Sequence, residues 1–193
     1  MKKSFVLSLI IIFFSLGNFQ LKAACTIPTI AETSVAPSID GDIDAVWLTA
    51  PAQSIAKQVN GMSALVNNPA GQWRAMFDGT YFYFLIEVND TDRRSTGDWN
   101  GDAVELYIRD GWGNKRQIGF GYQSNTTPAR YADYTGGNAV MKDVANTYNG
   151  TAGYTLELRI PKSDMNLASF GVGNTLYMEV TINQTNNSGG TTR

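Results

Sequence analysis

Residues 99–110 read WNGDAVELYIRD and carry the clearest strand signal in the chain. Apolar and polar side chains alternate along the second half of this segment, which is the two-residue period of a β-strand. A strand buried on both faces would be apolar throughout, so we expect the polar face of this strand to meet solvent or a ligand. The apolar face carries Val104, Leu106 and Ile108, and the polar face carries Glu105, Tyr107 and Arg109.

Trp99 lies just before this strand, in a run from Asp98 to Gly101 that is rich in turn-forming residues. An indole ring can cover the apolar C–H face of a pyranose, and charged groups on the strand can form strong hydrogen bonds with sugar hydroxyls. The combination therefore indicates a carbohydrate site. The alternative is an amphipathic strand beside a tryptophan that plugs the end of a β-sandwich.

Short strands separated by turn residues continue along the chain, and no long helix is indicated. This pattern predicts an all-β fold, a jelly-roll-like antiparallel β-sandwich with short helical turns. Trp47 belongs to an apolar set beside one of these turns, so we expect it in the core. Residues 50–71 and 123–150 are expected to form irregular connections. The expected strands are residues 73–77, 81–88, 104–109, 116–122, 154–160 and 175–182, and the expected helical turns are residues 43–47 and 161–165.

The first 24 residues have the pattern of a secretory signal peptide. A short basic region with Lys2 and Lys3 precedes an apolar run from Phe5 to Leu16, which is too short for a comfortable membrane span. We therefore expect an exported chain, secreted or held at the cell surface. Residues 25–33 would form an N-terminal lead-in, and residues 34–193 would form a single domain.

Cys25 is the only cysteine, so the chain cannot form an internal disulfide. Its position at the cleavage point leaves a lipid anchor as an alternative to a plain secreted chain. However, Lys22 stands where the lipoprotein pattern has an aliphatic residue. The plain secreted chain is therefore favoured.

The chain contains no histidine, and its net charge is −2, or −5 without residues 1–24. Histidine-activated nucleophiles, histidine-based zinc sites and histidine-ligated haem are excluded. No Gly-rich phosphate loop between a strand and a helix is visible in the sequence. An acidic domain without a basic cluster argues against nucleic acid or an anionic membrane as the partner, so neutral polar ligands remain open.

Five segments in this order make the chain resemble a family 9 carbohydrate-binding module, over about residues 34–193. The resemblance implies a non-catalytic β-sandwich that binds the ends of sugar chains, such as plant cell-wall polysaccharides of xylan or cellulose type. It also implies association with a secreted glycoside hydrolase that takes part in carbohydrate catabolism. The segments are IDGxIDxxW at 39–47, YxYFxIxVxD at 81–90, WxxDxVELYI at 99–108, YxxExxIP at 154–161 and VxIN at 180–183.

The resemblance also implies site residues. Trp99 matches one of two tryptophans that clamp the terminal sugar, and Glu105 matches a hydroxyl-binding glutamate. Asn183 and Gln117 match polar residues on neighbouring strands, and both lie on non-core faces by parity. Two departures stand out. Gly119 stands where similar members often carry arginine, and the second clamp tryptophan, which would follow Asn183, does not occur before Arg193. Trp112 could replace it from a neighbouring turn, and the alternative is that Trp112 packs over the end of the sheet. The complete set of expected sugar-binding residues is Trp99, Glu105, Tyr107, Arg109, Trp112, Gln117 and Asn183.

Two other classes of function stay open. A glycosidase needs two carboxylates that flank one bond. Asp102 and Glu105 point to opposite faces because their spacing is odd, whereas Glu105 and Glu179 could share a face. The other class comprises surface adhesion domains and haem-binding sandwich domains, of which haem binding fits poorly without histidine.

No cofactor is required by the expected function, but a calcium ion fits the acidic loop around Trp99. Carboxylate oxygens suit calcium better than a transition metal. The alternative is a solvated acidic loop in which the aspartates hold turns. The candidate ligands are Asp90, Asp92, Asp98 and Asp102.

The end of the chain suggests a truncation. Residues 183–190 are turn-forming and follow a strand, so a further strand ought to come next, yet we expect none before Arg193. Without it, one sheet would have an open edge. A C-terminally truncated module is the favoured interpretation. The alternative is a complete, shorter chain whose residues 26–28 cover that edge.

Overall fold

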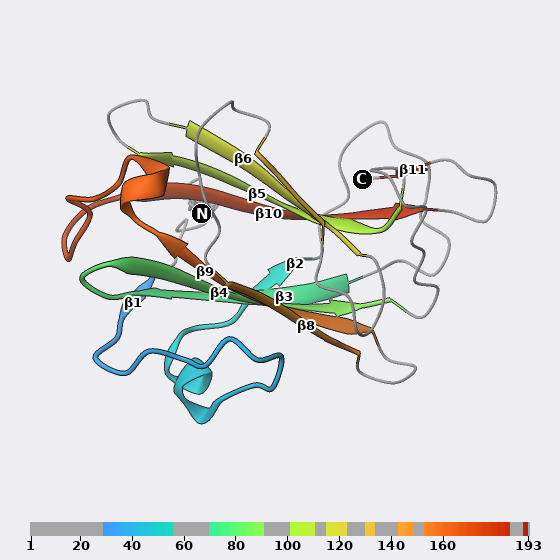
Figure 1. Cartoon of the computed structure of the whole chain (residues 1–193), viewed down its shortest axis with the longest axis horizontal. Coiled ribbons are helices and arrows are strands. Elements are labelled where there is room, and N and C mark those ends of the chain that lie inside the picture. Colours follow the sequence, from blue (N-terminus) through green and yellow to red (C-terminus); the bar gives the residue numbers. More distant parts are fainter. Residues whose placement is uncertain are drawn as a thin grey trace, which may run out of the picture.

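A computed structural model of the chain describes residues 29–55, 70–90, 101–110, 115–122, 130–133, 143–148, 153–185 and 191–192. Two β-sheets lie face to face, one above the other in Figure 1. Only short 3-10 turns interrupt the strands among these residues, namely η1 (Ala45–Thr49) and η2 (Ser163–Met165). The predicted β-sandwich with short helical turns is therefore confirmed.

Sheet 1, the lower layer in Figure 1, has the strand order β1-β3-β4-β9-β8, and β2 pairs with the same edge of β3 as β1. Its hairpin β3–β4 has the turn at residues 78–80 that the sequence predicts. All pairs are antiparallel except the short parallel pair of β1 and β3. The strands are β1 (Ala31–Glu32), β2 (Gln53–Ile55), β3 (Ala70–Phe77), β4 (Tyr81–Asn89), β8 (Asp143–Tyr148) and β9 (Tyr154–Pro161).

Sheet 2, the upper layer, has the order β11-β10-β5-β6-β7, so the last long strand pairs with the central strand β5. All its neighbouring strands are antiparallel. The strands are β5 (Ala103–Asp110), β6 (Lys115–Gly121), β7 (Arg130–Asp133), β10 (Leu176–Thr185) and β11 (Thr191–Thr192).

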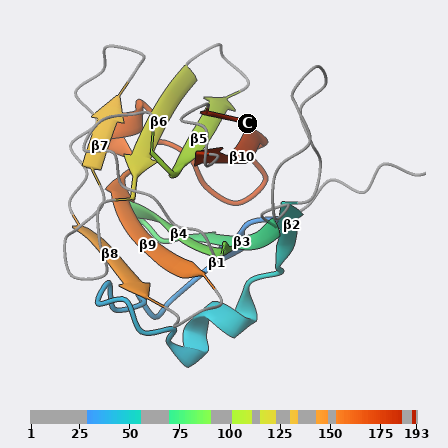
Figure 2. The same ribbon diagram turned by 90° about the vertical axis from the view of Figure 1, so that its right-hand side faces the viewer.

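The two sheets differ in what covers their outer faces. β4 is apolar almost throughout, which is the pattern of a strand buried on both faces. Its inner face, with Phe82 and Phe84, packs in the core between the sheets. Its outer face, with Tyr83 and Leu85, packs under the fully buried Trp47 of the segment that precedes β2. Figure 2 shows this segment, with η1, running across the outer side of sheet 1.

β5 keeps the strict alternation of its sequence. Val104, Leu106 and Ile108 are buried in the core between the sheets, as predicted. The other face of β5 points away from sheet 1. The outer face of sheet 2 is therefore polar, whereas the outer face of sheet 1 is an apolar surface covered by the chain itself.

Some expectations from the sequence need correction. Residues 123–150 are not only irregular, because they include β7 and β8; residues 50–71 include β2 and the start of β3. Their Asn-, Thr- and Gly-rich composition hides these strands, since β-structure depends on pairing partners more than on intrinsic preference. The expectation that no strand follows β10 is also wrong, because β11 pairs with Gln184 and Thr185.

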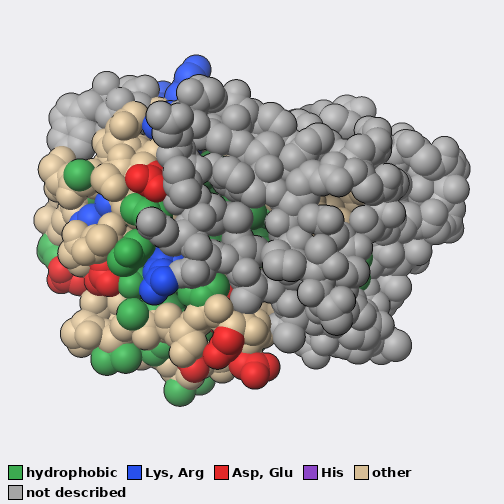
Figure 3. Space-filling view, viewed as in Figure 1, with side chains coloured by type: hydrophobic (Ala, Val, Ile, Leu, Met, Phe, Trp, Pro, Cys, Tyr) green, Lys and Arg blue, Asp and Glu red, His purple; other side chains and the backbone are tan. Residues whose placement is uncertain are grey.

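The proposed signal peptide and Cys25 lie outside the described residues. In the described part of the chain, no helix is long and apolar enough to cross a membrane. Figure 3 shows charged side chains of both signs dispersed over the described part of one face.

Candidate functional site

The register of β10, β5 and β6 arranges the outer face of sheet 2 in rows that cross the sheet. Because side chains two residues apart share a face, each row contributes one residue from each of the three strands. From one end of the strands to the other, the rows are Tyr177–Arg109–Lys115, Glu179–Tyr107–Gln117, Thr181–Glu105–Gly119 and Asn183–Ala103–Gly121.

Glu105 is the centre of a hydrogen-bond cluster on this face. The Nδ2 group of Asn183 donates to its Oε1 over 2.6 Å, and Nε2 of Gln117 donates to its Oε2 over 3.0 Å. The Tyr107 hydroxyl also donates to Oε2, and Gln117 contacts that hydroxyl at 3.2 Å. Three side chains from three strands therefore meet at the carboxylate of Glu105.

The carboxylate at the centre of this cluster is buried, and burying a charged group costs free energy unless hydrogen bonds compensate for it. Glu105 is 2% exposed and Asn183 is 4% exposed, although both lie on the outer face of the sheet. A buried carboxylate needs hydrogen-bond donors, and here they come from β5 itself and from both neighbouring strands. Within the described residues, Oδ1 of Asn183 and Oγ1 of Thr181 have no hydrogen-bond partner. The cluster thus contains two buried polar atoms whose hydrogen-bonding capacity the described residues leave unused.

Small residues surround Glu105 on the same face. Gly119 pairs directly with Glu105, and the next row contains Ala103 and Gly121. Gly119 stands where the resemblance described above implies an arginine. At these positions no long side chain rises from the sheet, so another group can approach the backbone closely.

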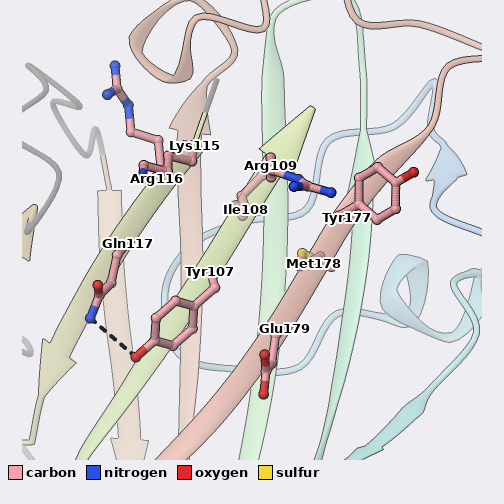
Figure 4. A pocket seen from close by; sticks show the side chains of 9 residues that line it. All are labelled: Tyr107, Ile108, Arg109, Lys115, Arg116, Gln117, Tyr177, Met178 and Glu179. Atoms are coloured by element: carbon pink, nitrogen blue, oxygen red, sulfur yellow. Dashed lines mark hydrogen bonds between the residues drawn. The ribbon is translucent and has the colours of Figure 1, made fainter. Parts of the chain in front are cut away.

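A cavity of about 690 Å³ lies on this face beside the Glu105 cluster (Figure 4). Tyr107 and Gln117 border both the cavity and the cluster, and the hydrogen bond between them is visible in the figure. Arg109, which the sequence also predicts in the site, lines the same cavity. Its volume falls in the range of small-molecule sites.

Sequence reasoning missed part of this cavity. Parity places Tyr177 and Glu179 on the outer face of their strand, but only the β5–β10 register reveals that they face Arg109 and Tyr107. Lys115 carried no motif that would mark it. The residues that line the cavity are Tyr107, Ile108, Arg109, Lys115, Arg116, Gln117, Tyr177, Met178 and Glu179.

Trp99 and Trp112 lie outside the described residues, so their roles stay predictions. The proposed carboxylate pair of Glu105 and Glu179 shares the outer face, as parity requires. However, Glu105 is held as an acceptor by three donors, and this arrangement suits a hydroxyl-binding group better than a general acid.

The predicted calcium ligands are described only in part. Asp90 at the end of β4 and Asp102 before β5 are both buried, and Asp92 and Asp98 lie outside the described residues. Burial, and then the negative charges of Asp102 and Asp90, raise the pKa of Tyr154 well above its ordinary value. Among the described residues, no three acidic, histidine or cysteine side chains could hold a metal ion together. The calcium site therefore stays a prediction.

A second buried glutamate lies on the outer face of sheet 1. Glu157 is fully buried, and its Oε1 accepts a 2.7 Å hydrogen bond from the indole N–H of Trp47. Its Oε2 accepts the backbone N–H groups of Gly41 at 2.7 Å and Asp40 at 3.2 Å. Burial raises the pKa of Glu157, and these hydrogen bonds oppose that shift only in part. All three donors come from the covering segment, so this carboxylate fastens that segment to the sheet.

A sandwich with one outer face covered and the other carrying a polar cluster and a cavity defines a β-sandwich binding module. The profile of the family described as "Carbohydrate family 9 binding domain-like" matches residues 39–193. The chain belongs to this family of carbohydrate-binding domains. A comparison with curated proteins finds no significant match.

Two solved structures share the fold, and both are family 9 carbohydrate-binding modules from Caldicellulosiruptor kristjanssonii. One is in complex with cellotriose; it is 18% identical, has a TM-score of 0.66, and the match covers 86% of this chain and 80% of that chain. The other is in complex with glucose; it is 19% identical, has a TM-score of 0.61, and the match covers 83% of this chain and 80% of that chain.

Proposed function

We propose that the chain binds the ends of plant cell-wall polysaccharides or oligosaccharides of xylan or cellulose type without cleaving them. The proposal includes export of the chain and its service as a module of a secreted glycoside hydrolase in carbohydrate catabolism. The observation that supports sugar binding is the buried carboxylate of Glu105, which accepts hydrogen bonds from donors on three strands beside a cavity on the outer face of sheet 2.

The chemistry of this face suits a sugar. A carboxylate with fixed orientation accepts hydroxyl protons, and the amide groups of Gln117 and Asn183 can donate and accept. Trp99, which precedes β5 in the sequence, would supply an apolar platform for the C–H face of the ring. Stacking together with a few charge-assisted hydrogen bonds gives weak, reversible binding of a neutral polar ligand.

Two structurally similar modules support the proposed type of sugar. The two solved family 9 modules hold cellotriose and glucose, which are a β-linked glucan fragment and its monomer. This likeness supports a short β-linked glucan or xylan fragment as the ligand. Recognition of a chain end is compatible with a cavity of this size, because a sugar end presents hydroxyls that an internal unit lacks.

Isothermal titration calorimetry with cellotriose, xylotriose and the α-linked maltotriose tests the proposal. We expect binding of at least one β-linked trisaccharide. For longer ligands the binding capacity per gram should fall with chain length, because each chain has a fixed number of ends. Absence of binding to every β-linked glucan and xylan, or release of new reducing ends during incubation, would contradict it.

A further inference from the structure

The end of the cavity away from Glu105 is positively charged. Its outermost row contains Lys115 and Arg109 from neighbouring strands, together with Tyr177. Arg116 also lines the cavity and is anchored by a 3.4 Å hydrogen bond to the backbone oxygen of Asp164. Arg116 pairs with the core residue Ile108, so its side chain belongs to the inner face, and the two basic side chains on the outer face are Arg109 and Lys115. They stand against one acidic lining residue, Glu179, in a protein whose net charge is negative.

Arg109 is held in one orientation by an aromatic ring. Its guanidinium carbon lies 4.7 Å from the centre of the Tyr177 ring, and Figure 4 shows the two side chains side by side at the edge of the cavity. Stacking engages the face of the guanidinium and leaves its N–H groups available in the plane. Tyr177 is 54% exposed, so the pair is open to a ligand.

Neither cation has an anionic partner in the described part of the chain. No described residue forms an ion pair or a hydrogen bond with the guanidinium of Arg109 or the ammonium of Lys115. Glu179 lies one row further along, opposite Tyr107, and forms no ion pair with Arg109. A planar guanidinium with free N–H groups beside an ammonium is a receptor for a carboxylate.

We propose that this end of the cavity is a subsite for the carboxylate of a sugar acid, so that the chain prefers oligosaccharides with a uronic acid. Arg109 binds the carboxylate in a bidentate manner and Lys115 adds a point charge. Glu179 repels a carboxylate placed over the next row, which fixes where the acid binds. The inference rests on the proposed function, because the rest of the ligand occupies the face around Glu105.

The spacing defines the ligand. Arg109 and Glu105 are four residues apart along β5, which corresponds to roughly 13 Å in a strand. A single sugar cannot contact both residues, whereas an oligosaccharide can. The preferred ligand is therefore an oligosaccharide with its terminal unit near Glu105 and its acidic unit near Arg109.

Calorimetry with two matched ligands tests the subsite. The ligands are xylotriose with one glucuronic acid branch and the same compound after reduction of the carboxyl to an alcohol. We expect the acidic form to bind roughly ten-fold more tightly, because one hydrogen-bonded charge pair contributes a factor of about that size to the affinity. The preference should shrink as ionic strength rises. Arg109→Gln and, independently, Lys115→Gln should each move the ratio of the two affinities towards one.

Arg159→Gln is the matched control, because Arg159 stacks on Tyr81 at 5.1 Å on sheet 1, far from the cavity. It should leave the ratio unchanged. Equal affinities for the two ligands, or a ratio that survives both cavity substitutions in folded protein, would overturn the subsite and leave sugar binding intact. Failure of both ligands and of cellotriose to bind would overturn the proposed function and the subsite together.

Discussion

Glu157 on sheet 1 and Glu105 on sheet 2 are both buried on the outer face of a strand, and each accepts hydrogen bonds from three groups. The donors to Glu157 belong to the segment that covers sheet 1. The donors to Glu105 belong to β5 itself and to the two neighbouring strands of the same sheet, and two of them, Tyr107 and Gln117, border a cavity. The same residue type in a similar position therefore serves the fold in one case and a binding face in the other.

The difference follows from the sequence patterns of two strands: β4, which pairs with the strand that carries Glu157, and β5, which carries Glu105. β4 is apolar on both faces, so sheet 1 must be covered on its outer side, and a buried carboxylate there can stabilise the cover. β5 is apolar on one face only, so the outer side of sheet 2 needs no cover. What a buried glutamate does is decided by the source of its donors.

Glu157→Gln should cause the largest change in free energy, and this change should be a loss of stability. The amide keeps one acceptor oxygen but turns an N–H group towards a donor, either Trp47 or Gly41. We expect a loss of about 3 kcal/mol in the free energy of unfolding, or roughly 6–12 °C in Tm, with unchanged sugar affinity below the transition. Thermal melting and calorimetry on the same sample measure both quantities. A stable variant that loses its sugar affinity would reverse the roles of the two glutamates.

Glu105→Gln should weaken sugar binding by about 1.5–3 kcal/mol, which is roughly ten- to a hundred-fold in Kd, because a charge-assisted hydrogen bond to a hydroxyl is lost. Titration with cellotriose measures the change, and Glu157→Gln is the matched control. If the two substitutions weakened binding equally, the comparison between the sheets would fail.

Trp99→Ala should reduce sugar affinity by about 1–2 kcal/mol, or roughly ten-fold, because an aromatic platform for the sugar is removed. Its control is Trp47→Phe, which keeps an aromatic ring in the core but loses the hydrogen bond to Glu157. The control should lower Tm and leave affinity unchanged. A Trp99 variant that melts early but binds normally would show that Trp99 is structural.

Asp78→Asn, at the turn between β3 and β4 of sheet 1, should cause the smallest change, a small loss of stability. Burial opposes ionisation of Asp78, but hydrogen bonds from Tyr83, Tyr81 and Thr80, with the charge of Lys162, lower its pKa below 3.8. A lowered carboxyl pKa contributes stability above the unfolded value, and this contribution is lost as pH falls through the folded value. At pH 7 we expect a loss of about 1 kcal/mol, or roughly 2–4 °C in Tm.

The Tm difference between the wild type and Asp78→Asn should narrow as pH falls below 4, and sugar affinity at pH 7 should not change. Melting curves over a pH series test the sign. A difference that widens in acid would show that the Asp78 carboxylate does not stabilise the turn between β3 and β4.

The two outer faces also differ in how far the sequence predicts them. Alternation along β5 and β10 assigns Glu105 and Asn183 to the non-core face, and the structure brings both to one cluster. Parity also places Glu157 on an outer face, but nothing in β9 itself indicates that Trp47, 110 residues earlier, would bury it. Such a contact depends on the path of a long connection, which local periodicity does not encode.

The residues that line the cavity could be predicted only in part, because their assembly also depends on contacts between segments far apart in the sequence. Tyr177 and Lys115 join it through the register between strands, and a shift of one residue would turn both away from Arg109. The short strands β7 and β8 were missed because turn-forming residues dominate the sequence on either side of them. In each case the missing information is long-range pairing.

The most direct test of the comparison is a two-dimensional NMR titration with cellotriose that follows side-chain N–H signals on both faces. Gln117 and Asn183 donate to Glu105, and the Trp47 indole N–H donates to Glu157. We expect the amide signals of Gln117 and Asn183 to shift with ligand concentration while the Trp47 indole signal stays in place. A shift of the Trp47 indole and of the Gly41 amide, with Gln117 and Asn183 unmoved, would contradict the assignment of the binding face to sheet 2.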